Sequence, residues 1–140
     1  MRALALRCAP LGITIKTPTD DALKYKIPPG PRERDFEDCL YALVTVLAKD
    51  KPRNARRVAE DVGELAQKLA VPDLVVNPYA HLDDNLADTP TSLYLLDHHI
   101  ATLEQFAAIN NSTWRVTALP FGYQKVWRDV TVLQAWFFHC

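Results

Sequence analysis

The run of residues 36–47, FEDCLYALVTVL, constrains the fold more than any other segment of this chain. It becomes continuously apolar and β-branched toward its end, whereas a strand with one face in water would alternate apolar and polar residues. The run therefore predicts a strand inside a sheet, with other elements packed on both of its faces.

Two segments have the apolar periodicity of amphipathic helices. Within residues 54–69 apolar side chains recur at spacings of four, three and four, and charged residues take the opposite side. Thr89 and Pro90 are typical of the N-cap and first turn of a second helix, which Asn110 and Asn111 can end. The inner stripe of this second helix is predicted to consist of Leu93, Leu96, Ile100, Leu103 and Ala107.

The amino-terminal part of the chain is β-prone and then rich in proline. Residues 2–8 and 11–16 are separated by Ala9-Pro10, which predicts two strands joined as a hairpin. Residues 17–34 contain four prolines and many charges, so we expect a loop that borders a site.

Three further short runs complete the expected sheet. Residues 73–77, DLVVN, predict a short buried strand, and residues 114–119 and 123–132 predict two more strands around the turn at 120–122. Strands that alternate with two main helices give a layered α/β sheet. A length of 140 residues fits one such domain, which we expect to span residues 1–140.

Charge and cysteine content limit the partners of the chain. With 16 basic and 17 acidic residues the net charge is -1, so no bulk positive field attracts a polyanion and any RNA contact has to be local. Cys8, Cys39 and Cys140 form no CxxC pair, which predicts a reduced, cytoplasmic protein without a zinc site. No apolar run approaches the ~20 residues of a membrane span, so we expect no membrane association.

One candidate site follows the predicted strand at 73–77. His81 lies in the segment 77–82, at the end of a buried strand, where open α/β sheets place their ligands. An imidazole can exchange hydrogen bonds there near neutral pH, although a lone histidine is more often a structural partner of backbone groups.

A second candidate site is the segment PFGYQK at residues 120–125, where a glycine precedes a lysine in an otherwise apolar strand. Lys125 can hold a water, stabilise an oxyanion or meet a phosphate; the alternative is a solvated lysine on the polar face of the strand. Tyr79, Phe121 and Tyr123 can stack on a base, although core packing is the commoner role of such aromatic residues.

Other chemistries lack their residue patterns. Asp97-His98-His99 spells the signature of metal-dependent phosphoesterases, but about 100° per residue separates the two imidazoles on the predicted helix. The carboxylate clusters of a two-metal site are absent, and neither Cys8 nor Cys39 has a histidine beside it in sequence. We therefore predict no metal, no cofactor and no cysteine nucleophile.

Taken together, VVNPYAHLDDNLA at 75–87 and ALPFGYQKVW at 118–127 resemble the paired signatures of the archaeal threonyl-tRNA synthetase editing domain. The resemblance extends over residues 1–128. It implies a fold like that of the D-aminoacyl-tRNA deacylases, a homodimer, and hydrolysis of the ester that joins serine to the acceptor end of tRNA(Thr). A pocket without room for the methyl group of threonine would admit serine alone.

The resemblance also assigns residues. It implies that strand backbone near Val46 recognises the amino acid and that His81 and Lys125 are catalytic pocket side chains. The implied mechanism is attack of water on the ester carbonyl, with help from backbone N–H groups and the RNA 2′-hydroxyl. The implied partner besides tRNA is the synthetase catalytic region, in cis or in trans. The other pocket positions that match are Pro78, Tyr79, Phe121, Gly122 and Tyr123.

The chain departs from the family pattern in three places. Residues 7–9 are Arg-Cys-Ala instead of His-Ser-Asp, Gln124 replaces a tyrosine, and residues 130–140 offer no glutamate where a helix normally bears an acidic pocket residue. Two alternatives therefore stay open: a D-aminoacyl-tRNA deacylase of the same fold, and an inactive tRNA-binding or dimerisation module. The apolar carboxyl end is expected to complete the core, to pair with another subunit, or to reflect an interrupted chain boundary.

Overall fold

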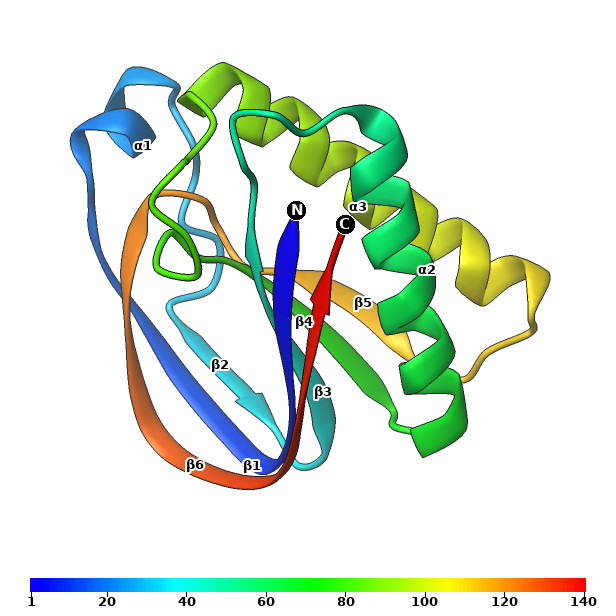
Figure 1. Cartoon of the computed structure of the whole chain (residues 1–140). Helices are drawn as coiled ribbons and strands as arrows, with labels where there is room; N and C mark the ends of the chain where they lie inside the picture. Colours follow the sequence, from blue (N-terminus) through cyan, green and yellow to red (C-terminus); the bar gives the residue numbers. More distant parts are fainter.

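A computed structural model describes the whole chain, residues 1–140 (Figure 1). One sheet has the strand order β2-β1-β3-β4-β5, and a sixth strand, β6, pairs with β1. The elements in chain order are β1 (Arg2–Pro18), α1 (Asp20–Lys24), β2 (Glu33–Phe36), β3 (Cys39–Thr45), α2 (Pro52–Leu69), β4 (Asp73–Pro78), α3 (Thr89–Ile109), β5 (Arg115–Ala118) and β6 (Tyr123–His139).

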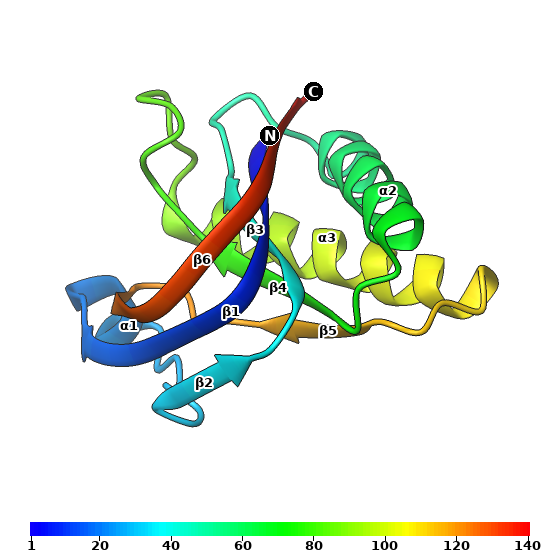
Figure 2. The same ribbon diagram turned by 90° about the horizontal axis from the view of Figure 1, so that it is seen from below.

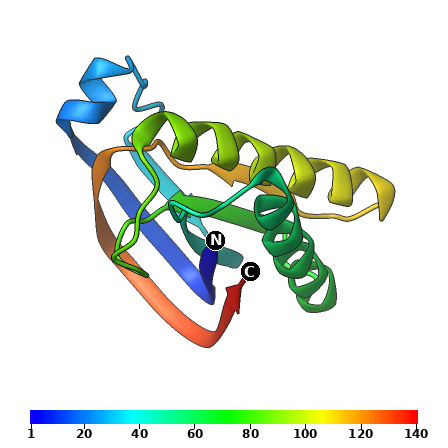
Figure 3. The ribbon, with the colours of Figure 1, turned by 45° about the horizontal axis from the view of Figure 1, so that its top comes forward.

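The central strand is β3, and all of its residues are buried, as the apolar run predicted. It runs antiparallel to β1 and parallel to β4. Ala42 and Val44 face the cluster that α2 and α3 cover, whereas Tyr41 and Leu43 face a second apolar cluster. Figures 2 and 3 show α2 and α3 on one face of the sheet and the long β1–β6 ribbon curving around the other side. The curled sheet itself therefore closes the second face.

The predicted amino-terminal hairpin is wrong, because β1 is one strand of 17 residues. Its first half pairs with β3 and residues 11–14 pair with β2, while β6 runs along both halves. Ala9 and Pro10 fall within a register shift between Cys8 and Leu11. Because both halves find partners on two sides, the proline break is absorbed as a bulge and not as a chain reversal.

The proline-rich segment 17–34 is not wholly a loop. Thr19 caps the short helix α1 by accepting a hydrogen bond from the Ala22 amide at 3.4 Å, and the segment ends in strand β2. A five-residue helix is too short to give an apolar period, so only its capping threonine marked it in the sequence.

Helix α2 confirms the predicted amphipathic helix, and α3 confirms the second one with two corrections. Asp88, not Thr89, is the N-cap of α3, and it accepts the Thr91 amide at 2.8 Å. The buried residues of α3 are Ser92, Leu95, Leu96, His99 and Leu103, so the buried stripe includes residues that the prediction omitted. The stripe is shifted because α3 packs on α2 as well as on the sheet; His99 Nδ1 lies 3.1 Å from the Ala55 carbonyl oxygen of α2.

The carboxyl-terminal part of the chain contains the two expected strands, but they do not pair with each other. β5 runs parallel to β4, and after the turn at 120–122 the chain crosses to β1 as β6. Trp136 and Phe138 pack against the main core, whereas Phe137 on the other face is exposed. None of the three helices combines the length and the apolarity that crossing a bilayer requires.

Candidate functional site

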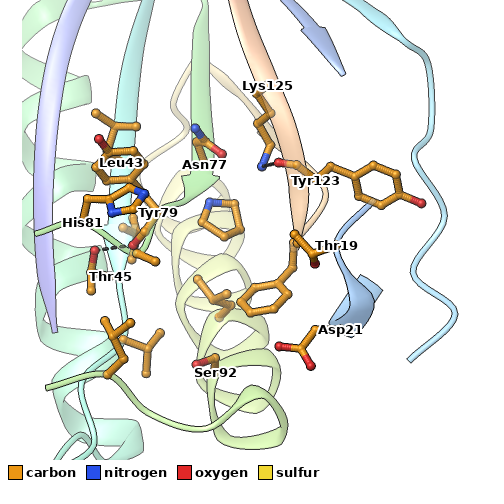
Figure 4. Close-up of a pocket in the computed structure, with 18 of the residues that line it drawn as sticks. Thr19, Asp21, Leu43, Thr45, Asn77, Tyr79, His81, Ser92, Tyr123 and Lys125 are labelled. Carbon is orange, nitrogen blue, oxygen red and sulfur yellow. Dashed lines mark hydrogen bonds between the residues drawn. The ribbon is translucent and has the colours of Figure 1, made fainter. Parts of the chain in front are cut away.

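A cavity of about 960 Å³ opens at the carboxyl ends of β3 and β4. Its walls come from six segments: the ends of these two strands, the loop after β4, the start of α3, the start of α1 and the turn into β6. Figure 4 shows Tyr79 and His81 on one side of this cavity, Tyr123 and Lys125 on another, and Thr19 and Asp21 at the α1 end. All eight site residues predicted from the sequence line it: Val46, Pro78, Tyr79, His81, Phe121, Gly122, Tyr123 and Lys125.

His81 is held at the cavity by the backbone of the loop that follows β4. The Tyr79 amide donates to the Val44 carbonyl at 2.8 Å, and the Thr45 hydroxyl donates to the Tyr79 carbonyl. The rings of Tyr79 and His81 meet edge to face, with centroids 5.0 Å apart. The imidazole makes no hydrogen bond within the chain, so it is not the structural partner of backbone groups that the sequence left as an alternative, and both ring nitrogens are available to a ligand.

Lys125 lies on the inner side of β6, opposite Ile15 of β1, and is partly buried. Its ammonium group donates to the Tyr123 carbonyl at 3.3 Å and meets no carboxylate. Burial lowers the pKa of Lys125 to about 8. The freely solvated lysine of the alternative interpretation does not describe this side chain, which sits in a desolvated part of the cavity wall.

The turn into β6 brings a backbone carbonyl and an aromatic ring to the cavity. Gly122 has φ +78° and accepts the Thr19 amide at 2.7 Å, and a Cβ atom there would lie 2.9 Å from Thr19 Oγ1. The Tyr123 hydroxyl donates to the Ile27 carbonyl at 2.6 Å, which ties the proline-rich segment to the turn. The Tyr123 ring packs against the second apolar cluster and has the Arg32 guanidinium 6.0 Å from its centroid, and Phe121 packs against the main core, so Tyr79 is the more available ring for stacking on a base.

The backbone near Val46 is already engaged. Val46 follows β3 and is buried in the cavity wall, and its carbonyl accepts the Ala87 amide at 3.1 Å. The cavity thus has a wall of backbone at the expected place, with one of its acceptors partly used inside the chain.

Two polar residues of the cavity were missed in the sequence. Asn77 is 5% exposed; its Nδ2 donates to the Tyr41 hydroxyl at 2.6 Å, while its Oδ1 has no partner. Asp21 of α1 is the only carboxylate in the cavity wall, and the Thr89 hydroxyl donates to it at 2.8 Å. Asn77 could have been suspected from its place before Pro78, but Asp21 lies in a segment without any periodic signal.

The histidines of the Asp97-His98-His99 motif do not contribute to this cavity. His99 is fully buried between α2 and α3, and desolvation lowers its pKa to about 4. His98 meets the ring of Tyr94, with centroids 4.7 Å apart. No three His, Cys, Asp or Glu side chains lie close enough together to hold a metal ion.

The curled sheet and its helical layer give an α/β domain with the expected D-aminoacyl-tRNA deacylase-like fold. A solved structure of the c-Myc DNA unwinding element binding protein has this fold, with a TM-score of 0.63 over 100% of this chain and 99% of that chain. The two sequences are 11% identical, so the likeness concerns the fold alone.

Sequence comparison then identifies the family. Residues 1–132 match the archaea-specific editing domain of threonyl-tRNA synthetase, and the chain belongs to this family, whose place is in tRNA proofreading. It is 28% identical over 129 residues to the threonine–tRNA ligase of Nitrosopumilus maritimus and 37% identical over 76 residues to that of Caldivirga maquilingensis.

The threonine–tRNA ligase editing subunit of Aeropyrum pernix is 28% identical over 99 residues, which are 70% of this chain. The matched residues cover 91% of this chain for the Nitrosopumilus relative and 54% for the Caldivirga relative. The chain spans 12% to 22% of the length of these three relatives.

Proposed function

We propose that this chain hydrolyses the ester between serine and the terminal adenosine of tRNA(Thr). The observation that carries the proposal is the meeting of His81 and Lys125, from the loop after β4 and from β6, in one cavity with the six other predicted residues. Water adds to the ester carbonyl carbon, and the ribose oxygen leaves with a proton, so that free serine and intact tRNA are the products.

Lys125 stabilises the negative charge that develops on the carbonyl oxygen. With a pKa of about 8 the ammonium form still predominates at neutral pH, and partial burial strengthens its interaction with an oxyanion. His81 has two free ring nitrogens beside Tyr79, which suits it to hold the adenosine or the ester end in place. The one carboxylate of the cavity wall, Asp21, accepts the Thr89 hydroxyl at the α1 end, so the attacking water relies on backbone groups and the RNA 2′-hydroxyl.

The size of the cavity bears on specificity. A volume of about 960 Å³ is in the range of sites for drug-sized ligands, so it accommodates an aminoacyl-adenosine and not only the amino acid. Selection of serine against threonine therefore rests on a local contact with the extra methyl group and not on the total volume. Such a contact supplies about 1–3 kcal/mol.

The test follows ester loss from seryl-, threonyl- and D-aminoacyl-tRNA in the presence of the protein. We expect loss of serine alone, with the rate strongly reduced in Lys125→Met and reduced with weaker substrate binding in His81→Ala. Wild-type protein that leaves all three esters intact refutes the hydrolase, and preferential loss of the D-aminoacyl group assigns the D-aminoacyl-tRNA deacylase alternative.

One observation favours a different class of function. Asp21 is the only carboxylate in the cavity wall, and β6 continues as a strand where the family pattern has a helix with a glutamate. An inactive tRNA-binding module would retain the cavity without the acid. It predicts that a non-hydrolysable seryl-adenosine binds while seryl-tRNA is not turned over.

The partners follow from the same proposal. The editing reaction needs a synthetase catalytic region, in cis or in trans, and a cytoplasmic location where charged tRNA is available.

A homodimer would form through the free edge of β6, where Val132, Leu133 and Phe137 are exposed. Light scattering during gel filtration tests this: a monomer at micromolar concentration contradicts it.

A further inference from the structure

Five exposed cations lie close together on the segment that joins β3 to α2 and on the first turns of α2. This surface, which we call the 49–57 basic surface, consists of Lys49, Lys51, Arg53, Arg56 and Arg57. The one acid among these residues, Asp50, is buried against the terminal ammonium group of Met1 and accepts the Leu47 amide at 2.7 Å. The segment carries +4 and the whole chain -1, so the remaining residues together carry -5.

The position of these cations is unfavourable for the helix itself. The amino terminus of a helix carries a partial positive charge, so acidic residues stabilise the first turn and cations destabilise it. The first turn of α2 contains no acid and contains Arg53, and like charges recur at Arg56 and Arg57, three and four residues later.

Ion pairs within the chain do not offset this unfavourable placement of the cations. Only Arg57 has a carboxylate within 4 Å, that of Asp61 at 3.6 Å. An ordinary solvated helix face mixes both signs of charge, as the later turns of α2 do with Glu60, Asp61, Glu64 and Lys68. Cations at a helix amino terminus that form almost no ion pairs do not stabilise the fold, which indicates a functional surface. Five clustered cations on an otherwise acidic chain suit the binding of a polyanion.

Backbone hydrogen bonds connect this surface to the rim of the cavity. Val46 and Ala87 line the cavity and are joined at 3.1 Å, and the Ala48 amide donates to the Asn85 carbonyl at 3.0 Å. These bonds join residues 46–48 to residues 85–87, and Lys49 follows directly after the first of these two segments. Figure 1 shows the chain running from the end of β3 across the top of the molecule into α2.

We propose that the 49–57 basic surface binds backbone phosphates of the RNA strand whose 3′ end occupies the cavity. This inference rests on the proposed function. An RNA that leaves the cavity over the ribbon of residues 46–48 and 85–87 meets these cations next. The acidic remainder of the chain repels phosphates elsewhere, so a single route for the strand is favoured although the net charge is close to zero.

The test measures the dissociation constant of an RNA hairpin that carries the acceptor stem of tRNA(Thr) and its 3′ single-stranded end. It compares wild type with Arg53→Ala/Arg56→Ala and with Lys68→Ala/Arg115→Ala, a control pair of exposed cations away from the cavity rim. The two double variants have the same net charge. At about 0.1 M salt we expect affinity to fall roughly tenfold or more in the first variant, with the salt slope lowered by about 1 for each contact removed.

The control pair is expected to change affinity less than about twofold, and both variants should bind a seryl-adenosine amide, which lacks phosphates, like wild type. Equal weakening of RNA binding in both double variants overturns the inference. Vesicles of phosphatidylserine that bind wild type as tightly as the RNA, and lose binding in the same variant, also overturn the RNA assignment. Wild type that binds RNA as expected but leaves seryl-tRNA intact supports the surface and refutes the hydrolase.

Discussion

Acid should destabilise this domain through His99, a histidine that is fully buried between α2 and α3. Its Nδ1 lies 3.1 Å from the Ala55 carbonyl and its Nε2 has no partner. Desolvation lowers its pKa from 6.5 to about 4 in the folded protein. Well above pH 6.5 the ring is neutral in both states, so His99 adds no pH dependence there.

Between pH 6.5 and about 4 the unfolded chain takes up a proton that the folded chain does not, so the free energy of unfolding falls as the pH is lowered. A shift of this size corresponds to a loss of about 3 kcal/mol. Below pH 4 both states are protonated and this contribution levels off. A loss of this magnitude is a large fraction of the stability of a small domain.

Urea unfolding at pH 7, 6, 5 and 4 measures this contribution when wild type is compared with His99→Leu and with His98→Leu. Leucine at position 99 should flatten the pH dependence over this range by about 3 kcal/mol. Leucine at position 98, which is next in the chain and partly exposed, should leave the pH dependence of unfolding unchanged. A His99→Leu variant that loses as much stability as wild type between pH 7 and 4 refutes the argument.

Three further predictions concern the cavity. Gly122→Ala should lower the free energy of unfolding by about 1–3 kcal/mol because it adds backbone strain and a close contact. Gly30→Ala is the control: Gly30 has a similar φ but its Cβ would meet only a flexible arginine tip, so the free energy of unfolding should fall less. Equal losses of the two variants in urea unfolding contradict this. Turnover of seryl-tRNA should fall as pH rises through about 8, where Lys125 loses its proton, and Lys125→Arg should remove that fall in a pH–rate profile. Thr45→Val, which removes the donor to the Tyr79 carbonyl, should reduce turnover and lower the free energy of unfolding by about 1 kcal/mol; an unchanged rate shows that the loop carrying His81 does not depend on this bond.

The elements that the sequence predicted well are those whose pattern is local. The apolar run at β3 and the four-three-four spacing in α2 both reflect burial within one element, so residue spacing alone reveals them. The amino-terminal strand was misjudged because Pro10 marks a break in local structure, whereas the outcome depends on β2, β3 and β6 pairing from distant parts of the chain. The buried stripe of α3 was shifted for the same reason, since its contact with α2 is not visible in its own period.

The sequence predicted part of the cavity wall, because most of the predicted residues lie in two short motifs, and it missed the residues that tertiary contacts bring there. Two strand ends and one turn carry the eight expected residues, and motifs of several adjacent residues are recognisable without knowledge of the pairing. Asn77 reaches the cavity because it lies at the carboxyl end of β4, whereas Asp21 reaches it because α1 is tied to α3 through the Thr89 hydroxyl. Such tertiary hydrogen bonds leave no pattern in the sequence.

The long strand β6 holds the cavity lysine in place through pairing that runs far beyond the cavity. Lys125 is positioned by the β1 ladder at Ile15, and that ladder continues to the pair of Arg2 with His139. Trp136 and Phe138 add apolar contacts to the core from the carboxyl-terminal part of β6. The placement of Lys125 therefore depends on the pairing of β6 with β1, which extends well beyond the cavity.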